Sequence, residues 1–395
     1  MTAPPTKPLR QRVESVDVVR GVIMIIMALD HTRDFFGNAA ANPTNLATAS
    51  AGLFLTRWIT HFSAPTFFFL SGLGAYLALR RRTKSQLSVF LLTRGLWLVF
   101  LDAVLFRFLL QFNVDYHVTI LTVLWALGWS MVALAALSLL PTRIVAIIGA
   151  IMIFGHNLLD PIKAQSFGSW APLWNVLHSP GLLYMSPGHL VIVAYPLIPW
   201  IGVMALGYGI GPIYSMDPAR RRALLLRAGI AVTALFLILR ASNFYGDPAK
   251  WSAQKSGLFT ALSFLNTTKY PPSLLFLAMT LGPVLVLLSL VDARTPRFLR
   301  PALTIGKVPM FYYLLHFTVL HLLAILTALV RFGGVHWMFE SPTPDKYPIT
   351  QPPGWPASLP VVYLYWIAVV LLVYPACKWY AGVKSRSNNP WLSYL

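Results

Sequence analysis

Long uninterrupted stretches of apolar residues constrain this chain more than any other feature of its sequence. Ten of them follow one another, and each is long enough to cross a bilayer as a helix, which takes about 20 residues. Transmembrane barrel strands would instead give segments of about ten residues with alternating apolar and polar side chains. The expected helical spans are residues 16–36, 53–79, 87–110, 118–140, 141–159, 190–214, 223–239, 271–291, 308–330 and 359–380.

The composition agrees with a membrane protein. The 395 residues are 57% hydrophobic and 11% charged, whereas a water-soluble domain has about 25% charged residues. We therefore expect an all-α polytopic membrane protein with about ten transmembrane helices in one bundle. The expected domains are an N-terminal segment over 1–15, a transmembrane domain over 16–383 and a tail over 384–395. The single cysteine, Cys377, excludes an internal disulfide and a metal site built from several cysteines.

The charge of the chain indicates its topology. Lysine and arginine number 31 against 12 acidic residues, for a net charge of +19. In a soluble protein this excess would suggest nucleic acid as a partner, but in a membrane protein basic residues concentrate in cytoplasmic loops. Placing the N-terminus in the cytoplasm puts most basic residues on that side, including those at 80–84 and 220–227. The sequence thus predicts a multi-pass protein of the inner (cytoplasmic) membrane with both termini in the cytoplasm, the bilayer as a partner and no nucleic acid.

The first span carries charges that a simple membrane anchor does not need. Each charge at the centre of a spanning helix costs about 2.5 to 3.5 kcal/mol, so such residues normally face a bundle interior or a wet cavity. Arg20 and His31 are eleven residues apart, which is three helical turns plus about 20°, or about 16 Å. One face of the helix is therefore expected to carry an arginine near the cytoplasm and a histidine near the outer surface.

Two carboxylates are candidates to orient the His31 ring. Asp34 lies one turn beyond His31 on the same side, and Asp30 directly precedes it. Either could hold a ring nitrogen and stabilise an imidazolium, as an orienting carboxylate does, and the sequence does not decide between them. The alternative is that Asp30, Arg33 and Asp34 form a local ion network at the helix end, with His31 merely enclosed by it.

The second span adds Arg57 and His61 in its outer third. Counting at 1.5 Å per residue puts His61 about 12 Å and His31 about 8 Å below the outer boundary, so the two could face one cavity. We expect His61 to polarise a substrate or, alternatively, to be a satisfied core histidine. Two histidines do not make a metal site without a third ligand at suitable spacing, and we expect no metal.

Further polar residues are expected to contact the substrate. Lys269 lies at the outer mouth of the eighth span, before Pro271 and Pro272, where it could bind an anionic acceptor. Arg33, Arg57 and His316 complete this expected substrate-binding set. The glycines at 72–74 and 207–211 lie inside spans without a preceding strand, so they predict close helix packing and not a nucleotide-binding loop.

Two motifs resemble a known family. The family is the heparan-alpha-glucosaminide N-acetyltransferase catalytic domain family, represented in bacteria, within the wider transmembrane acyltransferase superfamily. Members of that superfamily share an arginine, ten intervening residues and a histidine in the first span, a spacing that Arg20 and His31 match. The likeness extends to residues 266–273 and 306–316. The two motifs are Arg12-x2-Ser15-x-Asp17-x2-Arg20-Gly21 leading to Asp30-His31, and Pro65-x-Phe67-x-Phe69-Leu70-Ser71-Gly72.

The resemblance implies a ten- or eleven-helix enzyme. Such an enzyme takes an acyl group, usually acetyl, from cytoplasmic acyl-CoA and passes it to a sugar or glycolipid across the membrane. It implies that Arg20 and Arg94 contact the donor, although Trp97 replaces the second arginine of the family's Arg-x2-Arg pair. Arg82 lies among the basic residues at the inner span ends, which suit the anionic CoA.

His31 could deprotonate the acceptor or accept the acyl group itself, and the sequence does not choose between these routes. The rival function is a proton-coupled transporter or flippase of a polar or anionic lipid-linked substrate, because buried Asp, Arg and His also suit proton-coupled transport. The acceptor, the acyl chain length and the existence of a homodimer are not determined by the sequence.

Overall fold

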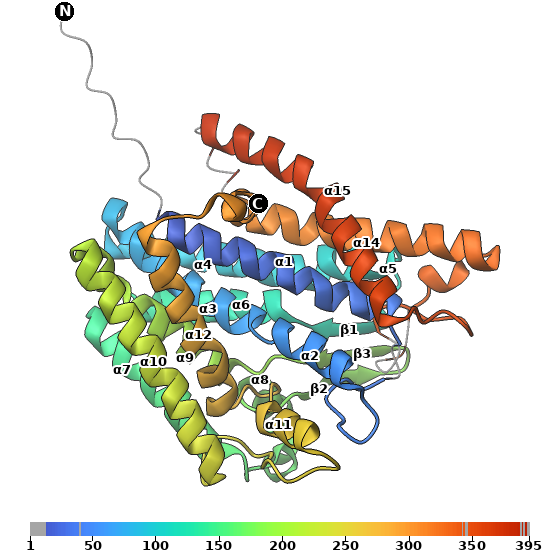
Figure 1. Ribbon diagram of the computed structural model, residues 1–395, viewed down its shortest axis with the longest axis horizontal. Coiled ribbons are helices and arrows are strands. Elements are labelled where there is room, and N and C mark those ends of the chain that lie inside the picture. Colours follow the sequence, from blue (N-terminus) through green and yellow to red (C-terminus); the bar gives the residue numbers. More distant parts are fainter. Residues whose placement is uncertain are drawn as a thin grey trace, which may run out of the picture.

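The computed structural model describes residues 13–38, 41–341, 343, 347–387, 389 and 392. Most of the expected N-terminal segment and part of the tail lie outside these residues. Each of the ten apolar stretches contains helix (Figure 1). These helices are α1 (Glu14–Phe36), α2 (Ala51–Thr60) with α3 (Ser63–Ala78), α4 (Lys84–Phe100) with α5 (Arg107–Gln111), α6 (Val123–Leu137), α7 (Thr142–Gly155), α9 (Leu197–Gly209), α10 (Pro218–Ser242), α12 (Leu274–Ala293), α14 (Pro309–Phe332) and α15 (Leu359–Arg386).

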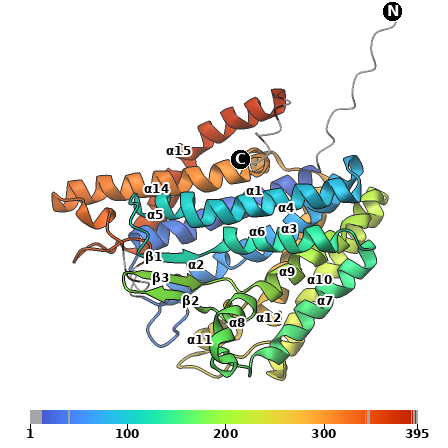
Figure 2. The same cartoon turned by 180° about the vertical axis from the view of Figure 1, so that it is seen from behind.

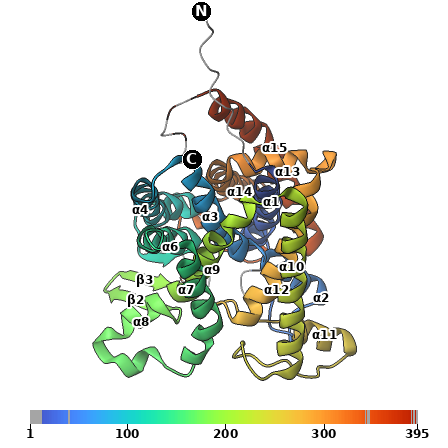
Figure 3. The same ribbon diagram turned by 90° about the vertical axis from the view of Figure 1, so that its left-hand side faces the viewer.

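Within the described residues, eight helical stretches are long and apolar enough to cross a membrane. The first and fourth expected spans are missing from the eight, for different reasons. Helix α1 is long enough but carries too many charges, and α6 is apolar but has only 15 residues. Helix α1 nevertheless packs against α2, α3, α12, α13 (Arg300–Lys307), α14 and α15. Helix α1 is therefore surrounded by other helices (Figure 3), and its residues Asp17 and Asp30 are buried.

A small sheet corrects the expected starts of two spans. Strand β1 (Val118–Leu121) pairs in parallel with β3 (His189–Val193), which pairs antiparallel with β2 (Gly181–Ser186). The spans expected at 118–140 and 190–214 thus begin as strands, and their helices start only at Val123 and Leu197. Short apolar runs rich in β-branched residues are compatible with either structure, so their pattern alone does not separate them.

The bundle has two distinct ends. We call the end that holds the start of α1 with Arg80 and Arg221 the basic end, and the end that holds the three strands the sheet end. Figure 1 and the reverse view in Figure 2 show α1 and α14 running side by side from the basic end to the sheet end. Two shorter helices, α8 (Ala171–Leu177) and α11 (Gly257–Leu265), belong to long connections.

Glycines set the closest helix crossings. A Cβ atom at Gly72 would lie 1.9 Å from the Met204 carbonyl oxygen, and one at Gly207 would lie 2.1 Å from that of Phe69, so α3 and α9 touch through their backbones. The predicted packing role is confirmed for Gly72 and Gly207, whereas a Cβ atom at Gly74 would have no neighbour within 4 Å. Helices α1 and α13 touch in the same way, because a Cβ at Gly306 would lie 1.8 Å from the Asp17 carbonyl oxygen.

One arginine organises the long connection after α10. The Arg240 side chain is 1% exposed and donates to the carbonyl oxygens of Ala249, Ser263, Phe264 and Asn266, at 2.6 to 2.9 Å. These acceptors come from the loop after α10, from α11 and from the turn that leads to Lys269. The buried guanidinium thus has its N–H groups satisfied by main-chain oxygens, which offsets the cost of burying its charge.

Candidate active site

A pair of histidines joins α1 to α14 near the sheet end. His31 Nδ1 lies 2.8 Å from His316 Nε2, and the two rings are stacked with centroids 5.1 Å apart. The Phe317 ring covers His31 at a centroid distance of 4.2 Å. His316 is fully buried, whereas His31 is partly exposed. The arrangement holds the His31 ring firmly while leaving part of it accessible.

The hydrogen bonds of this pair determine which nitrogens carry protons. His316 Nδ1 lies 3.0 Å from the carbonyl oxygen of Tyr312, which can only accept, so His316 Nδ1 donates. The other nitrogen of a neutral ring accepts, and His31 Nδ1 therefore donates to His316 Nε2. His31 Nε2 is left with its unshared electron pair. That atom can take up a proton or attack a carbonyl carbon.

The two carboxylates expected to orient His31 are engaged by arginines. Asp30 accepts from Arg57 and forms an ion pair of 3.0 Å with Arg33, and Asp34 pairs with Arg33 at 2.6 Å. The local ion network considered as the alternative is therefore present. It does not supply the hydrogen bond to His31, however, because that bond comes from His316.

Several expected substrate contacts gather around this network. Arg57, Lys269 and Asp30 lie close enough to His31 and to His61 to act on both rings electrostatically. His61 is 2% exposed, lies at the junction of α2 and α3, and packs edge-on against Phe276 at 5.3 Å. The junction follows from Pro65, which lacks the N–H that would continue the helical ladder.

Lys269 lies on the turn before α12. Loss of contact with water and the neighbouring Arg57 guanidinium lower its pKa below the usual range of a lysine. The Lys269 ammonium also approaches the Tyr270 ring, at 5.2 Å from the centroid.

The expected donor contacts are not all in one place. Arg20 donates to Asp17 at 2.8 Å and to the carbonyl oxygen of Gly306 in α13 at 3.3 Å. Arg82 and Arg94 instead flank the Phe90 ring of α4, at 4.2 Å and 5.6 Å. Arg20 and His31 lie on one continuous helix, and they contact the consecutive helices α13 and α14.

A polar pocket of about 370 Å³ opens at the basic end. It combines three arginines with two carboxylates and a tyrosine. Arg221 pairs with Asp292 at 2.7 Å, and Arg80 donates to the Tyr214 carbonyl oxygen at 2.7 Å. Its charged and polar lining comprises Glu14, Ser15, Arg80, Tyr214, Arg221, Asp292, Arg294 and Thr295.

Residues 12–245 match the family described as Heparan-alpha-glucosaminide N-acetyltransferase, catalytic. The match covers more than half of the chain. The chain belongs to this family. A search of curated proteins gives no match.

Family membership supports a membrane acetyltransferase-type function. The matched region contains Arg20, His31 and His61. Lys269 and His316, which complete the cluster at the sheet end, come later in the chain. Residues inside the matched region and residues of the later helices thus both contribute to the candidate site.

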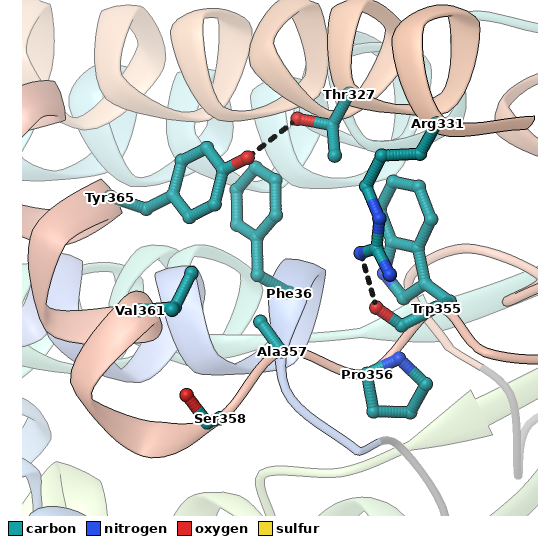
Figure 4. Close-up of a pocket in the computed structure, with 9 residues that line it drawn as sticks. All are labelled: Phe36, Thr327, Arg331, Trp355, Pro356, Ala357, Ser358, Val361 and Tyr365. Atoms are coloured by element: carbon teal, nitrogen blue, oxygen red, sulfur yellow. Dashed lines mark hydrogen bonds between the residues drawn. The ribbon is translucent and has the colours of Figure 1, made fainter.

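A second pocket, of about 350 Å³, lies beyond His31 at the sheet end. Phe36, at the end of α1, stacks on Tyr365 at 3.9 Å, and Tyr365 bonds to Thr327 at 2.8 Å (Figure 4). Arg331 lines one side of this pocket and donates to the carbonyl oxygen of Trp355 at 3.1 Å. No local pattern in the sequence marks these residues, because aromatic side chains are frequent in this chain and only the tertiary fold brings these together from α1, α14 and α15.

Proposed function

We propose that this protein transfers an acetyl group from acetyl-CoA to a hydroxyl or amino group of a sugar or glycolipid. One observation carries the proposal. Two successive hydrogen bonds, from His316 to the Tyr312 carbonyl oxygen and from His31 to His316, leave His31 Nε2 as a free acceptor. Family membership is the second support. It also favours acetyl transfer over proton-coupled transport or lipid flipping.

In the direct route, His31 Nε2 removes the proton from the acceptor while the acceptor oxygen or nitrogen attacks the thioester carbonyl carbon. The carbon–sulfur bond then breaks, and the thiolate of CoA takes the proton from His31. In the covalent route, His31 Nε2 attacks the thioester carbonyl carbon and CoA leaves as its thiolate. The acceptor then displaces the imidazole from the acyl group, and its proton passes to the thiolate. In both routes a positive charge develops on His31, and the nearby Asp30 carboxylate favours it.

The donor is proposed to bind with its phosphates at the basic end. Arg20 and the arginines of the polar pocket, Arg80 and Arg221, are the candidate contacts, since guanidinium groups bind phosphate in a forked geometry. The face of α1 between Arg20 and His31 is proposed to guide the thioester towards His31. The basic end would then face the cytoplasm, which is where acyl-CoA is made available.

The acceptor is proposed to approach from the sheet end. Lys269 and Arg57 supply positive charge for an anionic group such as a lipid-linked phosphate, with Arg33 and His61 beside them. The aromatic pocket beyond Phe36 offers ring faces of the kind on which a sugar can pack.

The central experiment measures release of CoA from acetyl-CoA by the purified protein, with His31→Ala as the test variant. We expect the variant to lose nearly all turnover. The matched control is His189→Ala, an exposed histidine on β3, which should keep wild-type turnover. Wild-type turnover in a folded His31→Ala protein would contradict the role of His31.

A second experiment addresses the donor site through thermal unfolding with and without acetyl-CoA. Acetyl-CoA should raise the unfolding temperature of the wild type and of Arg227→Ala, an exposed arginine of α10. It should raise that of Arg20→Ala much less, because binding to the folded state alone is what stabilises. Equal stabilisation of both variants would remove Arg20 from the donor site.

A further inference from the structure

Three side chains outside the candidate active site converge where α7 ends. They are His156, Asp160 and His178, and their potential ligand atoms all lie within 4.8 Å of one another. His178 Nε2 is 3.1 Å from Asp160 Oδ1. Two imidazoles and a carboxylate are a ligand set that suits zinc and similar divalent metals, whose neighbouring ligands lie about 3.3 Å apart in a tetrahedral site.

The burial of the two histidines is the second observation. His156 is 2% exposed and His178 is 1% exposed. Both ring nitrogens of His156 are buried without a hydrogen-bond partner among the described residues, and so is Nδ1 of His178. A buried polar group without a partner is costly. A metal ion bound by one nitrogen of each ring would give His156 a partner for one of its two ring nitrogens.

The carboxylate is held in a suitable orientation. Asn157 donates to Asp160 Oδ2 at 2.8 Å, which leaves Oδ1 directed towards His178. Asn157 in turn accepts from the backbone N–H of Leu274 at 2.9 Å, at the start of α12. Such a second layer of hydrogen bonds is typical of metal sites, where it fixes the ligands before the ion binds.

We propose that His156, Asp160 and His178 bind one divalent transition-metal ion of the zinc class, with a fourth position open to water. The ion joins the end of α7 to the segment that follows it, which leads through α8 to β2. Its role is to hold this connection in place beside the end of α7. No local sequence motif marks the cluster, because His178 is 18 residues from Asp160 and only the tertiary fold brings them together.

The test uses the full-length protein, purified without a polyhistidine tag, stripped with a chelator and titrated with Zn²⁺ or Co²⁺ alone. We expect about one ion per chain and, with Co²⁺, the intense visible absorption of a tetrahedral site. Asp160→Asn, which keeps the shape of the side chain, and His178→Ala should lose most of this binding. His117→Ala, a surface histidine stacked on His189, should keep it.

A second readout is proteolysis. Lys163 is exposed and is the only trypsin site between Arg143 and Arg220, so Zn²⁺ should slow cleavage there severalfold in the wild type and not in Asp160→Asn. Failure of the wild type to bind either ion would overturn the proposal. Equal binding by the wild type, Asp160→Asn and His178→Ala would do so too, because it would show an adventitious ion only. Neither readout depends on acetyl transfer.

Discussion

His31 is held by a neutral imidazole, whereas many catalytic histidines are held by a carboxylate. A neutral partner fixes the tautomer of His31 without placing a negative charge on its hydrogen bond. The charge that favours a protonated His31 comes instead from Asp30, which Arg57 and Arg33 partly neutralise. Orientation and charge are thus supplied by different residues.

Because His316 orients His31 and supplies no charge, we expect it to act as a positioning residue. His316→Ala removes the acceptor for His31 Nδ1, so we expect turnover to fall about 10² to 10⁴-fold with little change in the KM for acetyl-CoA. His316→Gln can present an amide oxygen and should recover part of the loss. A steady-state measurement of kcat and KM separates the two constants. A purely structural role would give equal losses for both variants.

At this scale the sequence indicates which residues matter better than it indicates their partners. Arg57 and Lys269, which were expected among the substrate contacts, lie close enough to His31 to act on its ring electrostatically, and the same two residues act on His61. His316 was expected as a substrate contact, but its place in the structure is against His31. The pairing joins positions 285 residues apart, and no local pattern encodes it.

The crossing of α1 with α13 connects the packing of whole helices to the site. Gly306 allows the two backbones to touch, and its carbonyl oxygen accepts a hydrogen bond from the Arg20 guanidinium. Since α14 begins two residues after α13 ends, the crossing also sets the position of His316 along α1.

Substitution of this glycine should therefore disturb the fold. In Gly306→Ala the added methyl group would lie 1.8 Å from the Asp17 carbonyl oxygen, so the helices must separate. We expect a clear loss of thermal stability, measured by unfolding in detergent. The control is Gly74→Ala, where nothing lies within 4 Å of the added atom. It should be neutral, or stabilising by up to about 1 kcal/mol through helix propensity. Similar unfolding temperatures for both variants would argue against a tight crossing.

The elements themselves were largely predictable, with instructive exceptions. Apolar length identifies the long helices but not the short helices α8, α11 and α13. The glycine pattern indicates close packing, but not that α3 and α9 are the partners. The strands β1 and β3 were not expected, because their four or five apolar residues continue directly into apolar helices. Arg107, which donates to the Val118 carbonyl oxygen at 2.9 Å, fixes β1 from a helix, and that contact is visible only in three dimensions.

For the molecule as a whole, the distribution of arginines predicts which end faces the cytoplasm. We expect the basic end inside, so a cysteine introduced at Ala253 should react with a membrane-impermeant maleimide in intact spheroplasts. One introduced at Ser385 should react only after lysis. Both positions are exposed, whereas the native Cys377 is fully buried and should stay unlabelled. The opposite labelling pattern would reverse the topology and with it the proposed donor side.

Arg240 has a consequence for how this protein can diverge. Its guanidinium donates hydrogen bonds to main-chain carbonyl oxygens of the connection after α10, and every amino acid supplies such an oxygen. The residues that supply these oxygens can therefore change side chain while the contacts with Arg240 are kept, whereas Asn243 and Asp247 also bond within the connection through their own side chains. The main chain that leads to Lys269 is thus held mainly by one arginine that does not depend on the side chains of its four partners.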